Sequence, residues 1–265
     1  MRIARFKTTG TRSAGGAVGF GVVDGDAEDP TSLRVTAIDG HPFAPFQAVG
    51  EPLPLAGVRL LAPVLPSKVL GFGRNYAEHA RELGNEVPEI PVVFLKPSTS
   101  VIGPGDPIVY PALSRDVHFA GELAVVIGRL CREVPIERAP DVVLGFTCAN
   151  DVTARDLQRS ENQWARAKGF DTFCPLGPWV DTDVDPAALS IRTTVNGDVR
   201  QDGTTQDMLR GVAECVAYVS AAMTLLPGDI VLTGTPAGVG PLAAGDEVAV
   251  SIGGIGTLTN PVVAQ

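Results

Sequence analysis

The chain has 265 residues, of which 45% are hydrophobic, and its formal net charge is −9 at pH 7. This length suits one large domain, with or without a small additional region, and needs no disulfide or metal merely to fold. The negative charge argues against nucleic acids and anionic membranes as partners, and no apolar run reaches the ~20 residues of a membrane-spanning helix. The first residues show no signal peptide, so we predict a cytoplasmic protein. The four cysteines form no Cys-x-x-Cys pair, which favours reduced thiols over disulfides or a zinc site.

Short β-strands separated by turns are expected at the start of the chain. The apolar stretches at residues 3–6, 17–23 and 33–38 have strand length. Prolines follow at positions 42, 45, 52, 54, 63 and 66, and they predict a connector because proline interrupts helices and central strands. We therefore predict a small β-rich N-terminal region (residues 1–65) and a larger domain (residues 66–265).

The larger domain is expected to be mainly β. Apolar runs of strand length occupy residues 69–73, 92–95, 123–127 and 230–233. Asn196-Gly197 separates two further strand-like segments and is a strong signal for a two-residue hairpin turn. The alternation of strands and helices typical of a doubly wound sheet is missing, so the predicted fold class is α+β, mainly β, with few helices.

Three helices are expected in this domain. The first is short, with Asn75 as its N-cap and Gly84 as its stop. The second runs from residue 153 to about residue 167 and ends at a glycine. The third is the longest; it opens at residue 204 or 205, ends at residues 227–228, and its core-facing stripe is Met208, Leu209, Val212, Cys215, Val216 and Val219.

His79 and Glu82 are the first candidates for chemistry. They lie three residues apart on the expected short helix, so they share one face. A carboxylate that accepts the imidazole N–H fixes the tautomer of the histidine and raises its basicity, which makes a water-activating base near neutral pH. The alternative is an ion pair on a solvent-exposed helix face.

Carboxylates form the second candidate group. Asp116, His118, Ala120 and Glu122 alternate along an extended chain, so their side chains point to one side. Glu122 opens an apolar strand, and a carboxylate at such a place needs a partner. A hard cation shared with Asp151 would supply one, and hydrogen bonds from backbone amides are the alternative.

Lys168 and the loop at residues 232–238 form the third group. Lys168 precedes Gly169 among apolar and aromatic residues, so partial burial with a depressed pKa is one interpretation. The other is an ordinary helix end, where lysine followed by glycine is common. The loop contains Gly234-Thr235-Pro236, whose backbone N–H groups and hydroxyl suit an anion.

Taken together, these segments resemble the fumarylacetoacetate hydrolase family. The resemblance covers the chain from about residue 66 to its end, and residues 1–65 resemble the variable N-terminal region of the shorter family members. It rests on six stretches that occur in family order: GFGRNYAEH (71–79), PVVFLKP (91–97), GELAVVIG (121–128), NDVTARD (150–156), KGFDTFCP (168–175) and LPGDIVLTGTP (226–236).

The resemblance implies a rolled, mixed β-sheet with few helices, usually in a homodimer. It also implies an enzyme that binds Mg²⁺ or Mn²⁺ through three carboxylates and acts on a small β-diketo acid, α-keto acid or related enol. His79 and Glu82 match a water-activating pair, and Lys168 matches a lysine that stabilises negative charge on the reacting oxygen. Glu122 and Asp151 match two of the metal ligands. The implied substrate contacts are Tyr76, Arg155, Gln158 and Thr235.

One metal ligand of the family pattern is missing. The usual segment Asp-Tyr-Glu-x-Glu-Leu reads His-Phe-Ala-Gly-Glu-Leu at residues 118–123, so Ala120 stands where the first glutamate is expected. Mg²⁺ can bind to one or two carboxylates plus water and substrate, so the change weakens the site without forbidding it. His118 lies on the same side of the strand and is a candidate substitute ligand for Mn²⁺ or Zn²⁺.

Three hypotheses about function follow. The first is hydrolysis of a C–C bond, or decarboxylation, of a small keto acid through a metal-stabilised enolate, with His79 and Glu82 as the base. The alternative is a metal-independent isomerase, dehydratase or cyclase of specialised metabolism that uses the same pair and Lys168 on an enol or polyketide-like substrate. A binding protein without activity is disfavoured, because His79, Glu82, Lys168 and Thr235 are all present.

Overall fold

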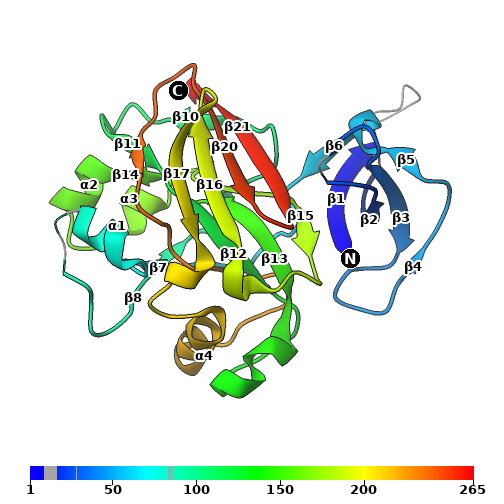
Figure 1. Cartoon of the computed structure of the whole chain (residues 1–265), viewed down its shortest axis with the longest axis horizontal. Coiled ribbons are helices and arrows are strands. Elements are labelled where there is room, and N and C mark those ends of the chain that lie inside the picture. The colour runs from blue at the N-terminus through cyan, green and yellow to red at the C-terminus, as the bar shows by residue number, and fades with distance from the viewer. Residues whose placement is uncertain (9–16, 28, 83, 85) are drawn as a thin grey trace.

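The structure, a computed structural model, describes residues 1–8, 17–27, 29–82, 84 and 86–265. Within these residues the largest sheet is mixed and has 13 strands (Figure 1). Its main path runs, in spatial order, through β4 (Gln47–Ala48), β3 (Arg34–Asp39), β2 (Val18–Asp24), β1 (Arg2–Thr8), β15 (Cys174–Asp181), β13 (Val143–Asn150), β12 (Gly121–Ile127), β18 (Ile230–Leu232), β7 (Val69–Gly73) and β8 (Val92–Lys96). The predicted fold class is confirmed.

The N-terminal strands β1, β2 and β3 cover the three apolar stretches named above, apart from their ends. The proline-rich segment is more ordered than a connector. It contains β5 (Leu53–Pro54), which pairs with β3, and β6 (Val58–Leu61), which pairs with β1. Of the prolines in this segment, Pro54 is the one that lies within a strand, the two-residue strand β5. Because β5 lies outside the main strand path, the N–H that proline lacks interrupts no hydrogen bonding between central strands.

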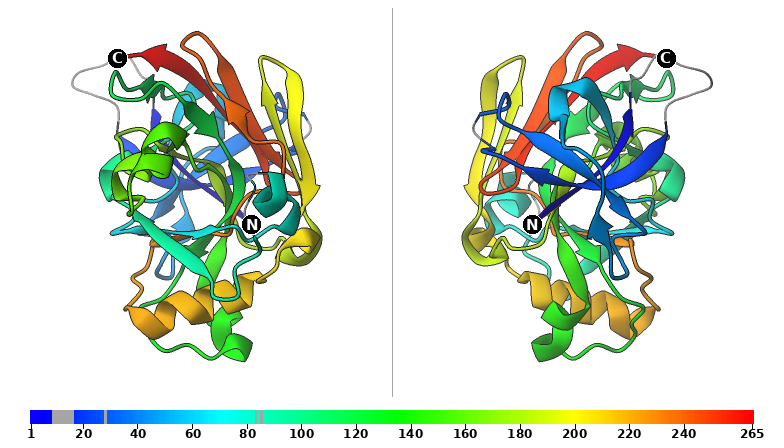
Figure 2. Two further views of the ribbon diagram at one scale, coloured as in Figure 1. Left: turned by 90° about the vertical axis from the view of Figure 1, so that its left-hand side faces the viewer. Right: turned by 90° about the vertical axis from the view of Figure 1, so that its right-hand side faces the viewer.

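A second layer packs against the middle of the large sheet. It is a five-stranded sheet with the order β10 (Ile108–Tyr110), β21 (Gly256–Ala264), β20 (Glu247–Ile252), β16 (Ser190–Val195) and β17 (Asp198–Thr204). Figure 2 shows β16, β17, β20 and β21 as a layer beside the green strands of the large sheet. The predicted hairpin is present between β16 and β17, and Asn196 and Gly197 have φ of 54° and 84°, as this turn requires.

Short strands complete the sheets near the functional residues. β9 (Val101–Ile102) pairs with β15, and a three-stranded sheet has the order β14 (Thr153–Ala154), β11 (Val117–Phe119), β19 (Gly240–Pro241). The described residues also form short 3-10 helices: η1 (Leu55–Gly57), η2 (Ser98–Ser100), η3 (Ile136–Val142), η4 (Pro186–Ala188) and η5 (Thr205–Asp207).

The predicted second helix is wrong as a continuous element. Residues 153–154 belong to β14, and two short helices follow, α2 (Arg155–Ser160) and α3 (Ala165–Lys168). Trp164, in the break between them, packs against Gly73, where an added Cβ would lie 2.7 Å from the indole ring. Its ring centroid is 5.9 Å from that of Phe94. The interruption is therefore fixed by packing on β7 and β8, which local sequence does not encode.

The other two helices are present with changed bounds. α1 (Ala77–Glu82) is followed by Gly84, whose φ is 68° and whose N–H donates to the carbonyl of Arg81. The longest helix, α4 (Val212–Ala222), begins later than predicted, because Thr204 and Thr205 instead lead into η5. Of its predicted core-facing stripe, Cys215, Val216 and Val219 are buried, whereas Leu209 is exposed and precedes the helix. In the described part of the chain, no helix is long and apolar enough to cross a membrane.

Candidate active site

A cavity of about 380 Å³ lies between the helices α1, α2 and α3 and the strands β7, β8 and β12. Aromatic walls come from Phe72, Phe94 and Trp164. The charged side chains that line it are four cations and two acids: Arg74, Arg155, Arg159, Lys168, Glu122 and Asp151. This excess of positive charge suits an anionic ligand.

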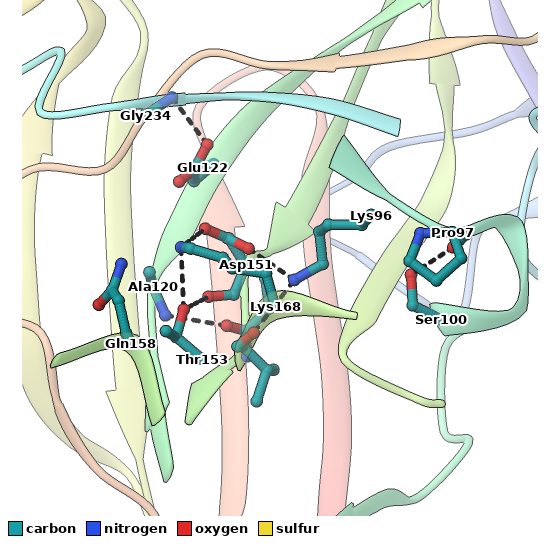
Figure 3. A network of polar contacts seen from close by, with 12 residues as sticks. Lys96, Pro97, Ser100, Ala120, Glu122, Asp151, Thr153, Gln158, Lys168 and Gly234 are labelled. Atoms are coloured by element: carbon teal, nitrogen blue, oxygen red, sulfur yellow. Dashed lines mark hydrogen bonds and ion pairs between the residues drawn. The ribbon is translucent and has the colours of Figure 1, made fainter. Parts of the chain in front are cut away.

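Asp151, directly after β13, is buried between two lysines. Its Oδ1 accepts a hydrogen bond from Nζ of Lys96 at 2.6 Å, and its Oδ2 accepts one from Nζ of Lys168 (Figure 3). Burial alone would raise the pKa of Asp151, but the charges of Lys168 and Lys96 hold this pKa below its usual value. Asp151 is therefore ionised, and both of its oxygens are engaged by ammonium groups.

Lys168 is the last residue of α3 and is 5% exposed. Its Nζ also donates to Oγ1 of Thr153 at 2.9 Å and lies 4.4 Å from the centroid of the Phe94 ring. Burial lowers the pKa of Lys168 to about 8, against the opposing effect of Asp151. An ammonium with such a pKa can stabilise a negative oxygen and also give it a proton. The interpretation of Lys168 as a buried lysine therefore agrees with this geometry.

Glu122, the second residue of β12, is 2% exposed. Its Oε2 accepts a hydrogen bond from the backbone N–H of Gly234 at 2.7 Å. Burial, reinforced by the nearby charge of Asp151, raises the pKa of Glu122 to about 8. This shift favours the neutral carboxylic form of Glu122, in which the side chain can donate a hydrogen bond in the cavity.

His79 and Glu82 are joined on α1 as their spacing predicts, with 3.2 Å between Nδ1 and Oε2. His79 is buried and lines the cavity, whereas Glu82 lies at the surface with its side chain 33% exposed, so the pair connects the cavity to the solvent side of α1. Glu82 is anchored in turn, because its Oε1 accepts a hydrogen bond from the N–H of Gly238 at 3.0 Å. Burial lowers the pKa of His79; Glu82 opposes this shift, and Arg155 adds to it. His79 is therefore neutral at pH 7, with Nε2 available as a base when Nδ1–H faces Glu82.

Arg155 and Gln158 lie one turn apart on α2 and both line the cavity. Nη1 of Arg155 donates to Oε1 of Gln158 at 2.8 Å. Nε of Arg155 is buried and has no hydrogen-bond partner among the residues that the structure describes. A buried guanidinium with an unused donor and an adjacent amide can bind a carboxylate in two-pronged fashion.

The Gly-Thr-Pro loop uses its donors within the protein. Besides the bond from Gly234 to Glu122, the hydroxyl of Thr235 donates to the carbonyl of Gly121 at 2.7 Å. This hydroxyl also accepts from Nε2 of Gln201 at 2.7 Å. Thr235 lines the cavity as expected, and its hydroxyl proton is engaged within the protein, so its contact with a substrate anion stays a prediction.

Comparison with known proteins identifies the family. Residues 68–263 match the model of the fumarylacetoacetate (FAA) hydrolase C-terminal domain, and residues 1–63 match an N-terminal model described as Rv2993c-like. The chain belongs to the fumarylacetoacetate hydrolase family. This confirms the resemblance drawn from the six motifs.

Three similar proteins are 41–54% identical in sequence to this chain. Protein Rv2993c of Mycobacterium tuberculosis is 54% identical over 251 residues, covering 94% of this chain and 95% of that protein. The mitochondrial oxaloacetate tautomerase Fahd2a of Rattus norvegicus is 41% identical over 266 residues, covering 93% of this chain and 85% of that protein. A crystal structure of 2-hydroxyhepta-2,4-diene-1,7-dioate isomerase from Mycobacterium marinum is 50% identical, with a TM-score of 0.91 and coverage of 100% and 99% of the two chains. The family thus supports an enzyme that acts on small molecules.

Two expected site residues are not part of the cavity lining, and two residues that were not expected support the site. Tyr76 is in the core, and its hydroxyl has no hydrogen-bond partner among the described residues. His118 is not part of the cavity lining; its Nε2 lies 2.8 Å from Oδ1 of Asp116. Sequence reasoning missed Lys96 and Gln201. The only signal for Lys96 is its place in the family stretch at residues 91–97, and Gln201 has none.

The side chains around this cavity do not fit the three-carboxylate metal site of the fumarylacetoacetate hydrolase family. Position 120 carries a methyl group, both oxygens of Asp151 accept from lysines, and one oxygen of Glu122 accepts from Gly234. Within the described ranges, no group of three histidine, cysteine, aspartate or glutamate side chains is placed to hold a metal ion. We therefore derive no catalytic step through a metal.

Proposed function

We propose that the chain interconverts the keto and enol forms of a small 2-keto acid that carries a second carboxylate. The observation that carries this proposal is one cavity lined by both His79, whose pKa is lowered by burial, and Lys168, whose pKa burial lowers to about 8. Tautomerisation needs one group that removes a proton from carbon and another that stabilises the charged oxygen. Two similar proteins are named for isomerisation reactions of this kind, one as an oxaloacetate tautomerase and the other as a dioate isomerase.

The cationic lining supplies a place for each carboxylate of such a substrate. Arg155 and Gln158 bind the carboxylate next to the keto group. Arg74 binds the second one: it lines the cavity, and among the described residues no side-chain hydrogen bond or ion pair of Arg74 is found. Arg74 has φ of 57°, a conformation that costs about 1 kcal/mol or more for such a residue and persists where the surroundings enforce it.

The proton transfer proceeds in two steps that balance. Nε2 of His79 takes a proton from the carbon next to the keto group, and the electron pair of that C–H bond forms the C=C bond of the enolate. The negative charge passes to the keto oxygen, where the ammonium of Lys168 stabilises it and then donates a proton to give the enol. Exchange of one proton with water restores neutral His79 and protonated Lys168. The reverse reaction uses the same two groups.

Hydrolytic C–C cleavage is a second candidate, which the His79–Glu82 pair favours. A base of this kind can take a proton from water, and the resulting hydroxide adds to the distal carbonyl of a β-diketo acid. The C–C bond then breaks, and its electron pair becomes the enolate beside Lys168. Decarboxylation would need the same enolate stabilisation without the water.

The test uses oxaloacetate, whose enol absorbs in the ultraviolet, with the wild type, His79→Asn and His41→Asn. His41 packs between Phe20 and Phe43, and no residue before Phe72 lines the cavity, so the second variant is a matched control. We expect the wild type to accelerate enol–keto conversion and His79→Asn to lower kcat/KM by about 100-fold or more. His41→Asn should keep the wild-type rate.

Product analysis separates the alternatives. Release of carbon dioxide from oxaloacetate at a rate above that of tautomerisation would favour decarboxylation. Cleavage of an acylpyruvate into two acids, lost in His79→Asn, would favour hydrolysis. A wild type that accelerates none of these reactions would refute the proposed assignment of base and cavity.

A further inference from the structure

We propose that a pair of lysines, Lys96 and Lys168, replaces the divalent cation at this centre, so that the chain works without a bound metal ion. Each ammonium binds one oxygen of Asp151, the carboxylate that matches a metal ligand of the family. These two contacts to Asp151 oppose metal binding whatever reaction the protein catalyses. The role of Lys168 as the positive group facing the reacting oxygen rests on the proposed function.

Lys96 donates two hydrogen bonds to neighbouring groups of the chain. Its side chain is fully buried at the end of β8, and its Nζ donates to Oδ1 of Asp151 at 2.6 Å and to the carbonyl of Val152 at 3.0 Å. A buried ammonium without a carboxylate would be strongly destabilising, so Lys96 depends on Asp151. A cation that took Oδ1 of Asp151 would leave Lys96 without its only ion-pair partner in the described chain.

Lys168 places a second positive charge on the other oxygen of the same carboxylate. Two ammonium groups already exceed the single charge of Asp151, and Arg155 lines the same cavity. Bringing a dication to this carboxylate would add like charges at contact distance in a buried place, where they are poorly screened. In the family's three-carboxylate arrangement, the additional acids compensate for this repulsion.

Ala120 removes one of those compensating acids from beside Asp151. The carbonyl of Ala120 accepts a hydrogen bond from the N–H of Asp151 at 2.9 Å. The two residues are therefore direct neighbours, Ala120 just before β12 and Asp151 just after β13. Ala120 is 2% exposed and lines the cavity. A glutamate at this position would place a carboxylate next to Asp151, whereas the methyl group offers no ligand.

The other acids do not make up the loss. Glu122 uses one of its two oxygens to accept a hydrogen bond from the N–H of Gly234, so this oxygen is already engaged within the protein. His118, the candidate substitute, lies outside the cavity lining, and its Nε2 is next to Asp116. Among the two acids that line the cavity, the only side-chain oxygen that accepts no hydrogen bond within the described chain is Oε1 of Glu122.

The experiment is a Mn²⁺ titration followed by the electron paramagnetic resonance of free Mn²⁺, with the wild type, Ala120→Glu and Ala120→Gln. The glutamine variant has the size of glutamate without its charge, so it controls for crowding at a buried position. We expect no stoichiometric binding by the wild type or by Ala120→Gln at submillimolar Mn²⁺. Ala120→Glu should bind one Mn²⁺ per chain, with a dissociation constant at least roughly tenfold below that of the wild type.

Wild-type binding decides the inference even if a variant does not fold. One Mn²⁺ bound per wild-type chain at micromolar concentration would overturn it, whatever the activity. Ala120→Glu that folds, as judged by circular dichroism, and still binds no tighter than Ala120→Gln would overturn the role assigned to position 120. Absence of wild-type binding together with absence of tautomerase activity would support the lysine pair and refute only the proposed function.

Discussion

The basicity of His79 results from five effects of its surroundings, three of which lower its pKa and two of which raise it. Burial lowers its pKa, Arg155 and Lys168 lower it further, and Glu82 raises it through a hydrogen bond and its charge. The net pKa is below the ordinary value, so the imidazole is neutral over the physiological range. Glu82 thus keeps a buried histidine basic enough to take a proton, while its second oxygen ties α1 to the N–H of Gly238.

Replacing Glu82 by glutamine tests this balance. The substitution removes the negative charge that raises the pKa of His79, so this pKa should fall further. The base form is present above the pKa; the acidic limb of the kcat/KM profile, which lies below pH 6.5, should therefore move to lower pH. The plateau rate should drop about tenfold or more, because a weaker base removes the carbon-bound proton more slowly. Glu78→Gln, an exposed acid on the same helix, is the control and should leave the profile in place.

An acidic limb that stays at the wild-type pH in Glu82→Gln, with the rate lowered, would contradict the coupling of Glu82 to His79. In that case the carboxylate would act only by anchoring α1 to the loop. Its contact with Gly238 makes this a distinct structural role.

At the residue scale, sequence reasoning succeeds where partners are close along the chain. His79 and Glu82 are three residues apart, so helical periodicity alone brings them together. One partner of Asp151, Lys96, is 55 residues away along the chain, and one partner of Gly121, Gln201, is 80 residues away. Such contacts depend on how strands are ordered in the sheet, which spacing does not reveal. The missing glutamate at position 120 is visible in the sequence, but its consequence depends on the two lysines.

At the scale of elements, the loop at residues 232–238 is a support for acidic side chains. Its Gly234 binds Glu122, its Gly238 binds Glu82, and Thr235 bridges Gly121 and Gln201. Gly234 has φ of 91°, and an added Cβ would lie 2.9 Å from Cβ of Asn75, so this position requires glycine. Asn75, predicted as a helix cap, instead donates from Nδ2 to the carbonyl of Thr233 at 2.8 Å and so fixes the same loop.

Thr235→Val tests whether the hydroxyl holds the loop or binds substrate. Valine has the shape of threonine but leaves the buried amide of Gln201 and the carbonyl of Gly121 without this partner. We expect a loss of about 1–3 kcal/mol in the free energy of unfolding, measured by urea denaturation. Thr235→Ser keeps the hydroxyl and should stay within about 1 kcal/mol of the wild type. Wild-type stability in Thr235→Val, combined with a raised KM, would instead assign the hydroxyl to the substrate.

The helices show where element prediction fails and why. The glycine signal located the end of α1 at Gly84, because it acts within a few residues, whereas the predicted cap Asn75 bonds to the loop instead. The interruption between α2 and α3 has no such local signal. It is set by Trp164, which packs on Gly73 and Phe94 from strands 70 or more residues earlier in the chain. The same packing makes Trp164 a wall of the cavity, so the failure occurs at a functional position.

At the scale of the whole molecule, the N-terminal strands and the cavity are separate. β1 continues the large sheet by pairing with β15 at two positions, Arg2 with Asp181 and Ile3 with Val180. Trp179 packs into the apolar cluster of the N-terminal strands, and every residue that lines the cavity lies between Phe72 and Thr235. The boundary near residue 65 stays a prediction, as do the homodimer that the family resemblance implies and the cytoplasmic location.

Deleting residues 1–65 tests that boundary. The remaining chain keeps all of the cavity and the buried clusters around β12 and α4, so it should fold and retain the wild-type kcat. It loses the strand that covers the end of β15 and the side chains packed on Trp179, which exposes a sheet edge and a large aromatic ring. We expect a melting temperature lower by roughly 5–10 °C and aggregation at high concentration. Differential scanning fluorimetry and light scattering measure both, with the full chain as reference.

A fragment that is folded and monodisperse but inactive would mean that the N-terminal strands shape the active cavity through the large sheet. The predicted division into two regions would then be wrong.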